Sequence, residues 1–363
     1  MTMILFNPPK ATTMPLPKAA AAYSLRWRSR LYSIAGLALL LGVVMVVASA
    51  VGSTHIPIGT IWGVLLSRLP FVDITPAWSA AVETIVVDIR LPRVLLAGLV
   101  GAALAVAGAT YQGLFRNPLA DPYLIGVAQG AALGAVVGFL LPWSVAGLIP
   151  VLAFSGGLLA VTAVYSIARV GKTLPVTTLI LAGVALGAFL GSITAYLMII
   201  SGDRLHGIIA WLMGRFSLSN WEQVWVIAAP CIIGVVVIWL HARPLNVMQL
   251  DEEQAQQLGI NVERVKLILL VAATLITAAA VSFVGTIGFV GIIIPHAVRL
   301  IWGPDHRFLL PLTTLAGASF LILADTAART VLAPTEIPVG VITAFLGAPF
   351  FLYLLRQKKV AVF

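Results

Sequence analysis

The chain contains very little cysteine and very little charge. Its 363 residues include one cysteine, Cys231, and only 10% of them are charged, while 60% are hydrophobic. A single cysteine excludes a disulfide within the chain and a CxxC metal or redox site. A soluble protein of this size could not hide so much apolar surface. The composition therefore indicates a membrane protein.

The apolar runs have the length of membrane-crossing helices. They are roughly 17 to 25 residues long, whereas the strands of a membrane barrel would alternate over about ten residues. We therefore predict an all-α, polytopic membrane protein. Ten transmembrane helices are expected, at residues 31–52, 92–114, 124–142, 146–168, 176–200, 223–241, 265–284, 287–302, 308–328 and 337–355. The seventh and eighth spans could instead be one longer segment, with a break inside it at residues 284–288.

The basic residues predict the orientation. With the N-terminus inside, the inner segments hold sixteen of the 22 lysines and arginines, as the positive-inside rule requires. The net charge of +9 thus reflects topology rather than nucleic-acid binding. We expect a cytoplasmic N-terminal tail at residues 1–30, a single transmembrane domain at 31–356 and a cytoplasmic C-terminal tail at 357–363.

Two arginines, Arg90 and Arg93, stand before the second predicted span at its outer end. They could lie along lipid with their charged heads in water, or bind carboxylates of an external protein through bidentate hydrogen bonds. Asp325 is the only acid placed inside a span, and Arg329 follows it by four residues. This spacing favours a structural ion pair near the outer end of that helix.

Two segments outside the spans have helical features. Residues 201–221 on the outer side carry tryptophans and charges typical of an interfacial helix. Residues 242–266 form the longest inner loop, and Leu250 to Gly259 within it predicts a polar helix stopped by glycine. That helix either contacts a cytoplasmic partner or only links two spans.

Glycines recur at every fourth position in two spans, at Gly126 to Gly138 and at Gly183 to Gly191. Such stripes favour close helix packing. A wide conduit for a bulky solute would show the same smooth faces, and the sequence alone does not separate the two interpretations.

Catalysis by this chain is not expected. Gly171-Lys172-Thr173 lacks the earlier glycine of a phosphate-binding loop, since position 166 is Ser166. No Ser-His-Asp, paired-carboxylate or metal-cluster spacing occurs. Any ATP that drives this protein must therefore be used by another subunit.

Several motifs together resemble one family, the permease subunits of ABC importers for iron siderophores, haem and vitamin B12. They are Arg90-Leu-Pro-Arg93, Asn117-Pro-Leu-Ala-Asp-Pro, Leu250 to Gly259, Gly288-Phe-Val-Gly-Ile-Ile-Ile-Pro-His296, Gly303-Pro-Asp-His-Arg307, Ala324-Asp-Thr-Ala-Ala-Arg329, Glu336-Ile-Pro-Val-Gly340 and Leu346-Gly-Ala-Pro349. They run in family order from about residue 85 to residue 355.

The resemblance implies a type II ABC importer permease in the bacterial inner membrane. It implies a second permease protomer, either identical in a homodimer or different in a permease pair. It also implies two ATPase subunits on the cytoplasmic face and a periplasmic or lipid-anchored solute-binding protein outside. This chain would hold no cofactor, and ATP and Mg would bind the ATPase subunit. The expected cargo is an iron chelate, with cobalamin as the alternative. An ion-gradient-driven secondary transporter is the alternative from another class.

The resemblance also assigns roles to residues. Arg90, Arg93 and Arg329 would receive acidic residues of the binding protein. Contact with the ATPase is implied for Leu250, Asp251, Glu252, Gln254, Ala255, Leu258, Gly259 and Ile260. The translocation path and its gate would involve Gln129, Gly130, Val176, Thr177, Gly183 and Gly187.

Overall fold

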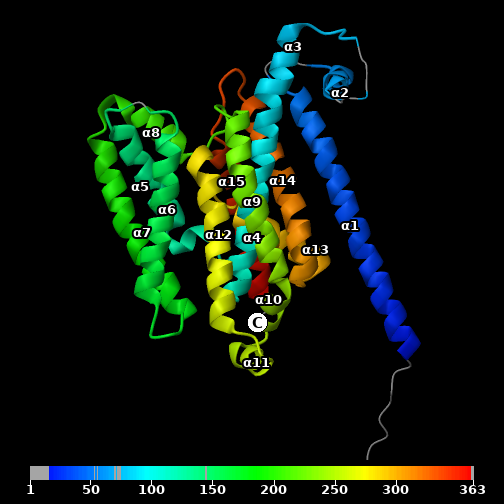
Figure 1. Cartoon of the computed structure of the whole chain (residues 1–363), viewed down its shortest axis with the longest axis vertical. Helices are drawn as coiled ribbons and strands as arrows, with labels where there is room; N and C mark the ends of the chain where they lie inside the picture. The colour runs from blue at the N-terminus through cyan, green and yellow to red at the C-terminus, as the bar shows by residue number, and fades with distance from the viewer. Residues whose placement is uncertain are drawn as a thin grey trace, which may run out of the picture.

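The structure is a computed structural model that describes residues 16–52, 54, 56–68, 71, 75–143 and 145–360. These residues fold almost entirely into helices (Figure 1). The helices are α1 (Leu16–Ala50), α2 (Ile58–Ser67), α3 (Ala80–Thr84), the π-helical η1 (Ile85–Arg90), α4 (Leu91–Leu114), the 3-10 turn η2 (Pro122–Ile125), α5 (Val127–Leu140), α6 (Leu148–Ala168), α7 (Val176–Ile199), the 3-10 turn η3 (Gly202–Arg204), α8 (Leu205–Leu212), α9 (Trp221–Leu240), α10 (Ala242–Met248), α11 (Glu252–Gln257), α12 (Val262–Val284), α13 (Val290–Trp302), α14 (His306–Thr330) and α15 (Val339–Val360). The all-α prediction is confirmed.

Each of the ten predicted spans coincides with a helix. In the described part of the chain, seven helical segments are long and apolar enough to cross a bilayer: those in α1, α3–α4, α6, α7, α9, α12 and α14. The other three, α5, α13 and the apolar part of α15, are shorter than a full crossing. The exact count of ten crossings therefore remains a prediction.

The short helix α5 follows the 3-10 stretch η2, and the short helix α13 follows a non-helical stretch at residues 285–289. The Tyr123 hydroxyl bridges these stretches: it donates to the Ile287 carbonyl and accepts from the Ile287 N–H, both at 3.0 Å. Irregular backbone is tolerated within a membrane only where protein or a cavity satisfies its polar groups. This contact explains how the chain breaks at 285–289 without leaving the Ile287 amide and carbonyl unpaired.

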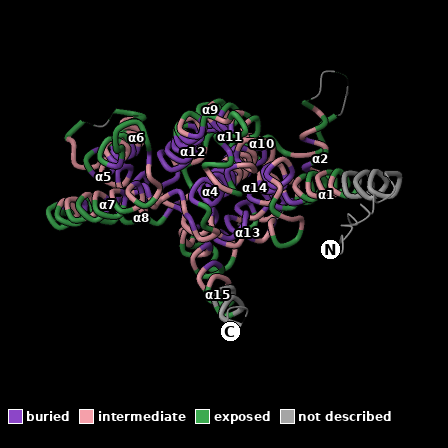
Figure 2. Tube along the Cα trace, turned by 90° about the horizontal axis from the view of Figure 1, so that it is seen from below, coloured by how far each residue is buried: buried purple, intermediate pink, exposed green. Residues whose placement is uncertain are grey.

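The core lies where α4, α12 and α14 meet. In these three segments between 67% and 78% of the most apolar window is buried, against 11% in α1 and 22% in α7. Figure 2 shows buried residues gathered around α4, α12, α13 and α14, with α5 to α8 forming a neighbouring group. The helices at the periphery therefore expose large apolar side chains, such as Leu39 of α1 and Phe189 of α7.

Glycines allow the central helices to cross in close contact. A side chain at Gly101 would overlap the Gly317 carbonyl of α14, and one at Gly108 would overlap the Gly291 carbonyl of α13. The stripe in α5 packs in the same way, because Gly130 and the following glycines lie against the backbone of α6. Close packing, the plainer interpretation of the α5 stripe, is confirmed.

The two ends of the molecule differ in what they carry. Figure 1 places α2, α3 and α8 at one end, and α11 with the first turns of α1 and the end of α15 at the other. We call these the α3 end and the α11 end. The α8 helix and the glycine-ended α11 confirm both helices predicted outside the spans.

The structure differs from the sequence-based limit of the second span, adds one helix and extends helical structure into the predicted N-terminal tail. The second span does not begin at residue 92: the helix begins at Ala80, where the Ser79 side chain caps it, and passes through the wide turns of η1. These wide turns accommodate Pro92, which lacks an N–H. The apolar helix α2 was not predicted. The predicted tail at 1–30 is helical from Leu16 onward, and its first fifteen residues lie outside the described part.

The C-terminal boundary also differs. Helix α15 continues to Val360, into the segment predicted as a tail at residues 357–363, and the last three residues lie outside the described part.

Candidate functional site

The three arginines predicted to bind an external protein gather at the α3 end. Arg90 and Arg93 come from the continuous η1–α4 helix and Arg329 from the last turn of α14. They line one cavity of about 250 Å³ together with Thr54 and Glu336. The fold therefore brings together side chains that are more than 230 residues apart in the sequence.

Arg93 is held by two carboxylates. Its Nε and Nη2 donate to Asp325 at 2.8 to 3.2 Å, and its Nη1 and Nη2 donate to Glu336 at 2.7 and 3.1 Å. Asp325 is buried, whereas the Glu336 side chain is 40% exposed. The predicted Asp325–Arg329 pair also forms, at 3.9 Å, but Arg93 is the nearer partner.

Arg90 and Arg329 cap the C-terminal end of α1. The Arg90 Nη1 donates to the carbonyls of Ser49 and Ala50 at 2.8 Å, and its Nη2 donates to Thr54. The Arg329 Nη2 donates to the Ala48 carbonyl. Cations at a helix C-terminus satisfy its free carbonyls and its dipole. All three arginine side chains are buried, so the interpretation of Arg90 and Arg93 as lipid-facing residues that reach into water is wrong.

At the opposite end, α11 projects from the molecule between two exposed leucines. Leu250 is 72% exposed and Leu258 is 70% exposed. The Asp251 carboxylate caps the helix by accepting from the Glu252 N–H at 2.8 Å, and Gly259 ends it with a φ of +82°. Ala255 is buried and anchors α11 to the membrane domain, while Gln254 lies exposed.

Ile260 follows this glycine and ties the end of α11 back onto its own helix. The Ile260 N–H donates to the Ala255 carbonyl at 3.0 Å. Two large apolar side chains beside a short polar helix are typical of a protein contact.

The residues predicted for the path and gate divide into two groups. Gly130 and Gly183 serve close packing, because added side chains would overlap Gly156 of α6 and Leu124 before α5. Gln129 lies next to Gly187 on the neighbouring α7, and its buried Oε1 has no hydrogen-bond partner among the described residues.

The first turn of α7 holds the other two predicted gate residues. Val176 is half-buried and Thr177 is exposed there.

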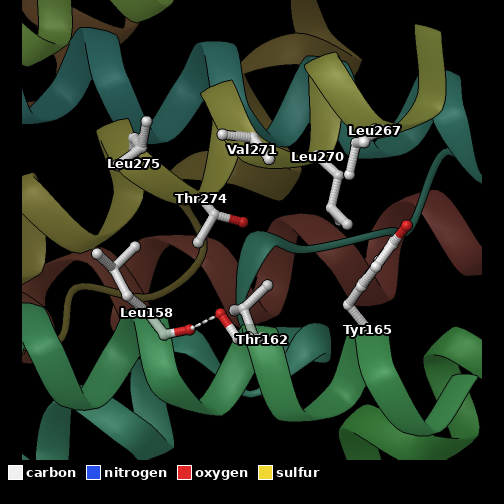
Figure 3. A pocket seen from close by; sticks show the side chains of 9 residues that line it. Leu158, Thr162, Tyr165, Leu267, Leu270, Val271, Thr274 and Leu275 are labelled. Atoms are coloured by element: carbon white, nitrogen blue, oxygen red, sulfur yellow. Dashed lines mark hydrogen bonds between the residues drawn. The ribbon is translucent and has the colours of Figure 1, made fainter. Parts of the chain in front are cut away.

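An apolar groove of about 280 Å³ lies between α6 and α12 (Figure 3). Two of its polar atoms are already paired: the Thr162 hydroxyl donates to the Leu158 carbonyl, and the Thr274 hydroxyl bonds to Tyr111. The remaining lining is mainly leucine and valine. The groove therefore offers little to orient a polar solute, and we do not assign it to the path.

A polar cluster at the α11 end joins α1, α10 and α14. Asp305 caps α14 and accepts hydrogen bonds from Arg307 and Asn246 at 2.7 to 3.2 Å, with Arg30 at 3.5 Å. Burial raises the pKa of Asp305, but the hydrogen bonds from Arg307 and Asn246 outweigh it and lower the pKa to about 2. The sequence marked Gly303 to Arg307 as a motif but gave no sign of these partners.

Comparisons with known proteins agree with this architecture. The sequence pattern of the FecCD transport family matches residues 39–357. The cobalamin import system permease protein BtuC of Halobacterium salinarum is 47% identical over 305 residues, 82% of each chain. The hemin transport system permease protein HmuU of Yersinia pestis is 40% identical, over 89% of this chain and 96% of its own.

A solved structure has the same fold over nearly its whole length. It is a metal-chelate type ABC transporter in an inward-facing conformation, with a TM-score of 0.77 and 32% identity, covering 89% of this chain and 98% of the other. The match of the family pattern extends from the middle of α1 to α15 and includes the arginine cluster and α11. The chain belongs to the FecCD transport family.

Proposed function

We propose that this chain is the membrane permease subunit of an ABC importer that takes up an iron chelate, either a siderophore or haem. The hemin permease relative and the metal-chelate transporter fold support this cargo class. The chain itself would act without enzymatic activity, and a separate ATPase with ATP and Mg would supply the energy. Uptake would proceed across the bacterial inner membrane, with both termini in the cytoplasm.

Cobalamin is the second candidate cargo. The cobalamin permease relative has the higher identity of the two named relatives, 47% against 40%. Cobalamin and haem are both large, metal-bearing macrocycles, so similar wide conduits would serve them.

The observation that carries the proposal is the projecting helix α11 with the exposed Leu250 and Leu258. On each protomer of a homodimer, one ATPase subunit would cover both of these leucines. ATP-driven closure of the two ATPases would then displace α11 and switch the packing of the membrane helices. The solute would pass between the protomers after a binding protein docks at the arginine cluster on the outer face.

Reconstituted uptake tests this function. Liposomes holding the permease and its ATPase would be given binding protein loaded with a radiolabelled ferric siderophore, haem or cobalamin, with an ionophore present to dissipate ion gradients. We expect uptake of one cargo that requires ATP and stops with a non-hydrolysable analogue. Uptake driven by an imposed ion gradient without ATP would contradict the proposal and favour a secondary transporter.

A further inference from the structure

A buried lysine at the start of α12 contacts both α11 and the segment before α7, at the α11 end of the molecule. The Lys266 side chain is only 4% exposed. Its Nζ donates to Glu252 of α11 at 2.7 Å, to Glu263 one turn back on α12 at 3.2 Å, and to the Leu174 carbonyl at 3.4 Å. These partners come from three separate segments of the chain, so Lys266 links all three.

The link to Leu174 is made at two points. The Glu263 carboxylate accepts from Lys266 through Oε1 and from the Leu174 N–H through Oε2 at 2.9 Å. The Leu174 carbonyl makes the second link by accepting a hydrogen bond from the Lys266 Nζ. Both backbone polar groups of Leu174, itself buried, are therefore fixed by the α12 side chains.

Leu174 stands directly before the first turn of α7. Pro175 follows it and caps the helix, and α7 begins at Val176. Proline fixes its own φ and restricts the residue before it. A displacement of Leu174 is therefore transmitted to the α7 N-terminus with little freedom to be absorbed between them. Four of the six residues predicted for the path and gate lie on or beside this helix: Gln129, Val176, Thr177 and Gly187.

The charges of this cluster suit their positions. Glu252 lies in the first turn of α11 and Glu263 in the first turn of α12, where carboxylates stabilise the helix dipole. The two carboxylates exceed the single lysine by one negative charge, and the Leu174 N–H accommodates part of that excess. A buried charge that loses one partner is left poorly compensated, so these groups tend to move together.

We propose that Lys266 is a positioning residue that transmits the displacement of α11 to the first turn of α7. The inference rests on the proposed function, because it assumes that an ATPase moves α11. Pulling on Glu252 would shift Lys266 and Glu263, which would carry Leu174 and the start of α7. The path would thereby open or close in step with ATP binding.

The experiment separates coupling from stability. A spin label at Thr177→Cys, exposed on α7, would report nucleotide-dependent distances between protomers, with the buried Cys231 replaced by alanine. The ratio of cargo imported to ATP hydrolysed is measured on the unlabelled complex of permease, ATPase and binding protein, in which Thr177 and Cys231 are kept. The variants are Lys266→Met, Lys266→Arg and Glu252→Gln. The last removes the negative charge of the α11 partner while keeping Lys266, Glu263 and Leu174 together. The Glu252 side chain is 29% exposed, so this variant serves where Lys266→Met fails to fold.

The control variant is Arg116→Gln. It removes a different ion pair of α11, with Asp251 at 3.7 Å, whose side chains are 47% and 42% exposed and which does not involve Leu174. We expect Glu252→Gln and Lys266→Met to hydrolyse ATP while losing at least about tenfold in the transport ratio and losing the Thr177 distance change. Lys266→Arg should recover part of both readouts, and the control should keep both.

Two results would overturn the inference by different routes. In the first, the wild-type complex imports cargo with ATP, and the Glu252→Gln complex keeps the same transport ratio and the same distance change. This result would show that Lys266 does not couple α11 to α7, and it would leave the proposed function intact. A wild-type complex with no ATP-dependent import would overturn the proposed function, and with it the assumption on which this inference rests.

Discussion

The Arg93 guanidinium lies 2.8 Å from the buried Asp325 carboxylate, although 232 residues separate them in the sequence. This pair ties α4 to α14 within the arginine cluster at the α3 end. Replacing Asp325 with asparagine would leave a buried guanidinium with only Glu336 as a close charged partner. We expect this single change to destabilise the fold by about 3–5 kcal/mol, since breaking a buried pair leaves an uncompensated charge.

The measurement is the unfolding midpoint of the purified protein in detergent, with Arg93→Gln and the double variant beside it. Because the double variant removes both charges, it should be more stable than the sum of the two single losses predicts. Equal, additive losses would show that the pair contributes no coupling.

Glu336 occupies the position at which a carboxylate of the binding protein is predicted to dock. It accepts from Arg93 at 2.7 Å and is 40% exposed, whereas Asp325 beneath it is not accessible. In Glu336→Gln the visiting carboxylate would meet Arg93 without a competing charge. We expect the affinity for the binding protein to rise about two- to fivefold, the scale of an exposed ion pair.

Titration of the binding protein onto permease in nanodiscs measures this affinity. Glu83→Gln is a matched control, because it removes another carboxylate of the α3 end, paired with Arg68 rather than with an arginine of the cluster. Unchanged affinity in Glu336→Gln would separate Arg93 from docking. Charge reversal at Arg90 and Arg93 tests the same site more severely, and it should abolish ATP hydrolysis that the binding protein stimulates.

The sequence predicted the helices well because apolar length is a local property. It predicted each of the ten helical segments and the glycine that ends α11. It did not predict the partners of Arg93, since the nearest carboxylates come from α14 and from the loop before α15. The four-residue spacing correctly indicated the Asp325–Arg329 pair but gave no sign that Arg93 lies closer.

The remaining differences have similar causes. The early start of the second helix depends on the wide turns of η1 before Pro92, and the shortness of α5 and α13 depends on the Tyr123 bridge to Ile287. Both features depend on tertiary contacts or backbone geometry, which apolar patterning does not encode. Lys266 had a local signal, the Glu263–Lys266 spacing at a helix start, but its link to Leu174 did not.

The exposed leucines of α11 should decide whether an ATPase binds. Replacing Leu250 and Leu258 together with serine removes two apolar side chains that a partner would bury, each worth about 1.5–3 kcal/mol when fully covered. We expect ATPase binding to weaken by about tenfold or more in a pull-down, with unchanged unfolding of the permease alone. Leu218→Ser at the α3 end, also exposed at 68%, is the control. Retention of the ATPase by the double variant would contradict the α11 interface.

The lowered pKa of Asp305 predicts that the folded protein loses stability in acid. Its folded pKa of about 2 lies below the ordinary value near 4, so its stabilising effect is complete above the unfolded pKa. That contribution is lost as pH falls from about 4 toward 2. We expect Asp305→Asn to lower the unfolding midpoint at pH 7, and the gap from wild type to shrink progressively between pH 4 and pH 2. A constant gap across this range would show that the carboxylate charge does not contribute.

Replacing two glycines of the same α7 stripe with alanine should have opposite effects on stability. A Cβ at Gly183 would overlap the Leu124 carbonyl and press on Ile125, whereas nothing lies within 4 Å of one at Gly191. Gly183→Ala should therefore destabilise the protein by about 1–3 kcal/mol through overpacking. Gly191→Ala should be neutral, or stabilising by up to about 1 kcal/mol, because alanine favours helix. Thermal unfolding of the monomeric protein in detergent measures both. Equal effects would mean that η2 and α7 do not approach as closely as the contact at Gly183 requires. A loss at Gly191 seen only in the dimer would place that face of α7 between protomers.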